Sequence, residues 1–104
     1  MLLVNIDRIP GKDFTAIGIV KGSVVRSKNF GKDFMALMKT FVGGEISDYT
    51  DMLNEARAIA TKRMVEDAEA QHADAVVTVR YASSAVMSGA AEVIAYGTAV
   101  RFAG

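Results

Sequence analysis

The sequence has no cysteine and only one proline among its 104 residues. Without cysteine the chain can form neither disulfides nor thiolate metal sites, and it has no thiol nucleophile. No stretch reaches the roughly 20 consecutive apolar residues that a membrane-spanning helix needs. The first residues meet Asp7 and Arg8 too early to form the apolar core of a signal peptide. We therefore expect a cytoplasmic protein with no membrane partner.

The chain also lacks an excess of either charge, because 12 basic side chains balance 12 acidic ones. Binding to nucleic acid needs a local excess of Lys and Arg, so the balance argues against it as the main partner. A hydrophobic content of 51% excludes a disordered chain. A chain of this length fits one domain, so we expect residues 1–104 to form a single domain.

Three segments alternate in the way that is typical of strands. Residues 14–25 alternate throughout, and residues 75–81 and 92–102 do so after a long helical segment. The last two segments are predicted to pair as an antiparallel hairpin, and residues 2–6 to form a short strand. The hairpin would turn in a region rich in small residues, namely Ser83, Ser84, Ser88 and Gly89.

Two helices are predicted between the first and second long strands. A short one begins near Lys32 and carries apolar residues at helical spacing, and Gly43-Gly44 ends it. A longer one begins near Ser47 or Asp48, either of which can cap its first turn, and ends near residues 71–73. Its predicted apolar face consists of Met52, Leu53, Ala56, Ile59, Ala60, Met64 and Ala68.

This order of elements predicts an α+β domain of two layers, with an antiparallel sheet covered on one face by one long and one short helix. The last strand has a face of small residues that a helix can approach closely: Val93, Ala95, Gly97 and Ala99. In the first long strand, alternation places Phe14, Val20 and Val24 on one side and Ile17, Ile19 and Val25 on the other.

Both faces of these strands are therefore apolar, whereas two small helices can cover only one face. An uncovered apolar face is typical of an interface, so we predict a homo-oligomer. The alternative is a monomer in which the N-terminal segment folds across the second face.

Metal-ligating residues are few. Glu69 and His72 form a Glu-x-x-His pair, which on helices contributes to di-iron centres. One such pair supplies too few ligands, and a polar helix end explains it as well. Asp48, Asp51 and Glu55 form an acidic cluster, but their charges also suit the positive end of a helix dipole. The methionines, including the Met35-x-x-Met38 pair, are accounted for as core residues.

Catalytic and ligand-binding motifs are also few. No glycine-rich phosphate loop and no nucleophile elbow occur, so we expect neither an enzyme nor a resident cofactor. Arg57 has no acidic residue four positions on, unlike the other basic residues of the long helix. At the start of that helix, polar side chains lie close to a glycine pair. We therefore predict a ligand site there, formed by Gly43, Gly44, Glu45, Tyr49 and Arg57. The alternative is that the glycines only turn the chain and that Arg57 pairs with an acidic residue across an interface.

Several motifs in order resemble the YbjQ-like family, which carries a heavy-metal-binding label. They are Ile9-Pro10-Gly11, Ile17–Gly22, Lys32-Asp33, Gly43-Gly44-Glu45, Tyr49, Ala56-Arg57, Ala60, Met64, Ala68, Ala73–Val77 and Tyr96–Val100. The resemblance covers essentially the whole chain. It implies a small α+β subunit, similar to a dodecin subunit, assembled into a ring-shaped pentamer.

One position departs from the family pattern, because His72-Ala73 stands where the family usually has Gly-Ala. Glycine readily adopts the left-handed conformation that ends a helix, and histidine adopts it at a greater cost. We therefore expect His72 to be strained at the end of the long helix. The leading functional prediction is a non-enzymatic oligomer that binds a small ligand or protein partner at subunit boundaries. The competing prediction is a metal-binding protein with carboxylate and histidine ligands.

Overall fold

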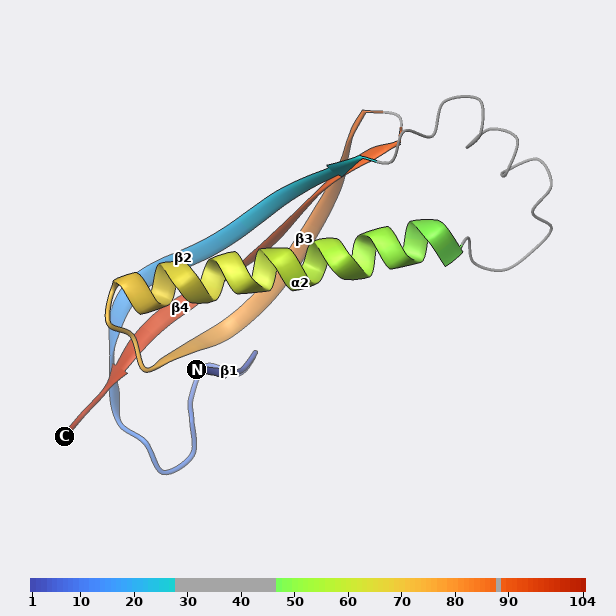
Figure 1. The fold of residues 1–104 in the computed structure, drawn as a ribbon. Helices are drawn as coiled ribbons and strands as arrows, with labels where there is room; N and C mark the ends of the chain where they lie inside the picture. Colours follow the sequence, from blue (N-terminus) through green and yellow to red (C-terminus); the bar gives the residue numbers. More distant parts are fainter. Residues whose placement is uncertain (28–46, 88) are drawn as a thin grey trace.

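A computed structural model describes residues 1–27, 47–87 and 89–104 (Figure 1). The described elements are strand β1 (Leu2–Leu3), strand β2 (Phe14–Ser27), helix α2 (Ser47–Ala70), strand β3 (Ala75–Met87) and strand β4 (Ala90–Phe102). The α+β class is confirmed. The short helix predicted from Lys32 and the glycine pair that follows it lie outside the described residues.

The strands form one mixed sheet in the order β1-β3-β4-β2. The antiparallel pairing of β3 and β4 is confirmed, and β2 pairs antiparallel with the other edge of β4. The expectation of a purely antiparallel sheet is wrong for β1, which runs parallel to β3 with Leu2 opposite Ala75. A long stretch of chain separates β1 from β3, so no tight turn forces them into an antiparallel pair.

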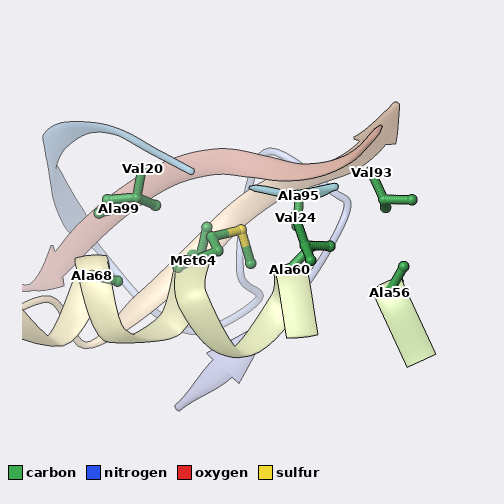
Figure 2. Close-up of a cluster of buried hydrophobic side chains, with 10 residues drawn as sticks. Val20, Val24, Ala56, Ala60, Met64, Ala68, Val93, Ala95 and Ala99 are labelled. Carbon is green, nitrogen blue, oxygen red and sulfur yellow. The ribbon is translucent and has the colours of Figure 1, made fainter. Parts of the chain in front are cut away.

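Helix α2 lies across one face of the sheet, mainly over β2 and β4 (Figure 1). Its predicted apolar face is confirmed, because Ala56, Ala60, Met64 and Ala68 are fully buried. Figure 2 shows these side chains between the helix and the sheet, against the valines and alanines of the strands. The small face predicted for the last strand is buried in the same layer, so it receives the helix as expected.

Gly22 determines how closely the helix approaches the sheet. A Cβ atom at this position would lie 2.3 Å from the backbone oxygen of Ala60 and 2.3 Å from the backbone nitrogen of Met64. Real Cβ atoms do not come so close to backbone atoms, so any side chain here would push α2 away from β2. The absence of a side chain therefore fixes the contact between the two layers.

Side chains of α2 also cover the outer edge of β2. The backbone N–H of Lys21 donates to the Asp67 carboxylate over 3.2 Å, and the Arg63 guanidinium donates to the Ser23 carbonyl over 2.7 Å. Further along, Arg26 forms an ion pair with Glu55 of the helix. Unpaired backbone groups at a sheet edge can recruit another strand, and here helix side chains occupy two of them.

The predicted strand faces are partly wrong, because two strands contain irregularities. The register of β2 shifts between Ala16 and Gly18, and the extra residue moves Ile17 to the helix side and Phe14 to the opposite side. In β3 the register shifts after Val77, beside Thr78, whose φ is 52°. Strict alternation cannot anticipate an inserted residue, because one residue reverses every following side chain.

The hairpin is longer than predicted. Ser83 and Ser84 belong to β3 and pair with Val93 and Glu92 of β4, although they were expected in the turn. The strand pairing continues to Met87, which lies opposite Ala90, and Gly89 just before β4 has a φ of 75°. Serine is compatible with an exposed strand, so the cluster of small polar residues overstated the length of the turn.

The face of the sheet opposite α2, here called the open face, is covered at one end by the N-terminal segment. Val4 and Ile9 pack there against the buried Ala75, Val77 and Val100. The strand predicted over residues 2–6 is shorter in the structure, spanning Leu2–Leu3, and beyond it Val4 and Ile6 form backbone hydrogen bonds to β3. The remainder of the open face exposes Ile19, Val25 and Tyr96, which are 77%, 56% and 37% exposed.

Replacement of Gly22 by alanine is expected to destabilise the fold by about 1–3 kcal/mol, because the new methyl group meets the backbone of α2. The free energy of unfolding in urea measures the effect. Ser23→Ala is the matched control, since Ser23 is exposed and contributes only its carbonyl to the contact with Arg63. The control should stay within about 0.5 kcal/mol of the wild type. Equal stability of the two variants would contradict the close contact.

Candidate functional site

The C-terminus of α2 ends in a Schellman motif centred on His72. The Ala73 N–H donates to the Ala68 carbonyl over 3.1 Å, and the His72 N–H donates to the Glu69 carbonyl over 3.0 Å. His72 has a φ of 60°, in the left-handed region. The strain predicted for this histidine is therefore confirmed, and its backbone role accounts for its position.

Arg101 of β4 completes this helix end. Its guanidinium donates to the Gln71 carbonyl over 3.0 Å and to the His72 carbonyl over 3.3 Å. A cation is favourable here because unpaired carbonyls and the helix dipole make the C-terminus negative. The His72 backbone is thus held by both the helix and the sheet.

The side chains of Glu69 and His72 are both exposed. Within residues 1–27, 47–87 and 89–104, no three or more Asp, Glu or His side chains are grouped so that they could hold a metal ion. A tightly bound metal usually takes three or four protein ligands. The described donor set therefore does not fit a resident heavy metal at this helix end.

The acidic residues at the start of α2 are similarly dispersed. Asp51 is exposed, and Glu55 is engaged by Arg26. The side chain of Asp48 lies outside the described part of the structure. The one helix described contains no segment long and apolar enough to cross a membrane.

The predicted ligand site is described only in part. Gly43, Gly44 and Glu45 lie outside the described residues, and Tyr49 is placed only as a backbone position in the first turn of α2. Arg57 is exposed on α2, where its guanidinium donates to the Asn54 side-chain oxygen over 2.9 Å. Among the described carboxylates none is within ion-pair distance of Arg57.

Arg57 is connected through Thr61 to strand β3. The Thr61 hydroxyl donates to the Arg57 carbonyl over 2.7 Å and lies 2.8 Å from the Tyr81 hydroxyl. Because Arg57 and Thr61 are four residues apart, they lie on the same side of the helix. Arg57 is therefore on the side of α2 that borders β3.

An open cavity of about 560 Å³ lies on this side of the sheet, between the N-terminal segment and β3. No sequence pattern indicated it. Its walls are mostly apolar, and two of its lining residues, Asn5 and Tyr81, have polar side-chain groups. The lining residues are Leu3, Val4, Asn5, Ile6, Val79 and Tyr81. Mostly apolar walls with a few polar groups are typical of small-molecule sites.

Sequence comparison gives matches over almost the whole chain. The YbjQ family, described as "Putative heavy-metal-binding", matches residues 1–103. A "UPF0145 protein" of Clostridium novyi is 60% identical over 97% of this chain and 98% of its own. Another from Alkaliphilus metalliredigens is 59% identical over 98% and 99% of the two chains, and one from Methanosarcina acetivorans is 51% identical over 97% and 96%.

The fold also resembles a solved structure. A crystal structure from Pediococcus pentosaceus, described as a protein of unknown function in the DUF74 family, matches with a TM-score of 0.67. It covers 99% of this chain and 98% of its own, at 14% sequence identity. This similarity supports the fold alone.

His72→Gly is expected to stabilise the protein by up to about 1 kcal/mol, because glycine adopts the left-handed conformation without steric cost. His72→Ala keeps the steric cost of the left-handed conformation, so its free energy of unfolding should remain within about 0.5 kcal/mol of the wild-type value. Urea unfolding measures both, and a zinc titration of the same variants should not distinguish them from the wild type. Equal loss of zinc affinity in the two variants would instead make the imidazole a metal ligand.

Proposed function

The chain belongs to the YbjQ family, and from this premise we propose that the protein is a cytoplasmic, non-enzymatic homo-oligomer. It binds a small ligand or a protein partner at the boundaries between subunits. The observation that supports the assembly is the uncovered part of the open face, where Ile19, Val25 and Tyr96 are exposed together. Large apolar side chains exposed on one face of a sheet are typical of interfaces between proteins.

A ring-shaped pentamer is the assembly proposed from the resemblance to dodecin-like subunits. The two edges of the sheet differ in a way that supports contacts between neighbouring copies. Helix side chains cap backbone groups of β2, whereas residues 81–87 of β3 have no partner strand among the described residues on the side away from β4. This segment is exposed and uncharged, so a strand of a neighbouring copy can add there.

The cavity beside β3 is the proposed place of ligand binding. It adjoins the free edge of β3, so a neighbouring copy that adds to this edge would lie next to it. Arg57 lies on the same side of α2 and, within the described part of the chain, has no carboxylate partner. A mostly apolar small molecule that carries an acidic group fits these surroundings.

Metal binding is the alternative function, and the family description is the observation that favours it. Glu69 and His72 would supply its carboxylate and imidazole ligands. The two side chains do not complete a ligand set with other described residues. The oligomeric binding domain is therefore the function that the geometry supports better.

Light scattering at micromolar concentration is expected to give a solution mass several times the 11.1 kDa of one chain. Ile19→Lys should lower this mass, because it places an unpaired charge in the apolar surface that the assembly buries. Glu66→Ala is the control and should keep the mass, because Glu66 is exposed on α2, away from the open face. A wild-type mass of a single chain would refute the oligomer.

Binding to the cavity can be tested with the fluorescent anionic probe anilinonaphthalene sulfonate. Asn5→Trp should reduce the fluorescence enhancement at least twofold, because the indole fills space that the cavity offers to an apolar probe. Asp7→Trp is the matched control, since this exposed residue does not line the cavity. If both variants bind the probe as the wild type does, the cavity is not the binding site.

A further inference from the structure

The uncovered part of the open face carries charges in an ordered arrangement. Strand pairing places Lys21, Tyr96 and Arg80 in one row across β2, β4 and β3. The next row consists of Ser23, Ile94 and Ala82, and the one after it of Val25, Glu92 and Ser84. Two cations therefore flank the central strand on one side of Ile94, and one anion lies on that strand on the other side.

None of these three charged side chains forms an ion pair within the described part of the chain. Lys21 and Arg80 are exposed, and Glu92 is half-buried. The row between them is uncharged, with Ile94 on the central strand between Ser23 and Ala82. The arrangement leaves unpaired charges of opposite sign on either side of an apolar centre.

Two copies can pack these faces together about a twofold axis in either of two ways. If the axis runs along the strands, Glu92 faces Glu92 of the other copy and Lys21 faces Arg80, so like charges meet. If the axis runs across the strands through the Ile94 row, strand positions are inverted. Glu92 then faces the Tyr96 row of the other copy, between Lys21 and Arg80.

We propose that the open face binds the open face of a second copy about a twofold axis through the Ile94 row, with Glu92 of each copy between Lys21 and Arg80 of the other. Strand geometry permits this contact. Glu92 and Tyr96 are four residues apart, or about 14 Å along a strand. The axis passes midway between them, so Glu92 of each copy faces the Tyr96 row of the other at the same time. Facing sheets pack about 10 Å apart, which the long Lys and Arg side chains can span.

The apolar residues are placed to be buried by the same contact. Val25 lies in the Glu92 row, so inversion brings it opposite Lys21 of the other copy, whose aliphatic stem can cover it. Ile94 faces Ile94 at the centre. The N-terminal segment covers the opposite end of the open face, over Ala75, Val77 and Val100.

This inference rests on the proposed homo-oligomer and specifies one of its interfaces. A contact with twofold symmetry joins copies in pairs, so a ring of subunits that uses it stacks on a second ring. The complete assembly then contains an even number of chains. The edge of β3 stays available for contacts within a ring.

Charge reversal tests the proposed contact. Glu92→Lys places a third cation between Lys21 and Arg80 and should weaken the pairing at least about tenfold, so the mass from light scattering falls to about half at micromolar concentration. The double variant Lys21→Glu with Arg80→Glu should have the same effect. Combining all three reversals exchanges the signs on both sides and should restore the wild-type mass.

Glu66→Lys is the matched control, since this exposed residue lies on α2 away from the open face and should leave the mass unchanged. Far-ultraviolet circular dichroism and thermal unfolding verify that each variant is folded. An unchanged mass in folded Glu92→Lys, or no restoration in the triple variant, would overturn this interface while the homo-oligomer stands. A wild-type mass of one chain would overturn the homo-oligomer itself.

Discussion

The contact between Gly22 and the backbone of α2 is the constraint on which the rest of the structure depends. Only a residue without a side chain lets Ala60 and Met64 approach the strand so closely. At this distance alanines and valines fill most of the space between the layers, with Met64 as the largest fully buried side chain (Figure 2). Close-packed interiors resist even one extra methyl group, so this position sets the separation of helix and sheet.

The same proximity determines where the charges of α2 lie. Arg63 and Asp67 reach past Gly22 to the backbone of β2, and Glu55 reaches Arg26. The helix is therefore displaced toward β2, and within the described part of the chain residues 81–87 of β3 have no partner strand on the side away from β4 and lie beside a cavity. One edge of the sheet is therefore capped by helix side chains, and it is on the other edge and the open face that the proposed contacts with ligands and other copies rest.

Much of the fold could be predicted because its signals are local. The apolar stripe of α2, the small face of β4 and the strained end at His72 each follow from residues near one another in sequence. The errors in the strand faces have one origin. The inserted residue in β2 and the irregularity at Thr78 in β3 reverse the strand faces, and no local pattern marks an inserted residue. The candidate site was less predictable, because Asn5, Thr61 and Tyr81 meet only after folding.

By itself, the sequence determined the α+β class, the buried face of the long helix and an apolar content greater than one helix layer can cover. These follow from periodicity and composition, which do not depend on distant residues. Only the tertiary structure decided that β1 joins in parallel, that the N-terminal segment covers just one end of the open face, and that Glu92 lies two rows from Lys21 and Arg80. Those relations depend on strand order and register, which are fixed by packing between residues far apart in the chain.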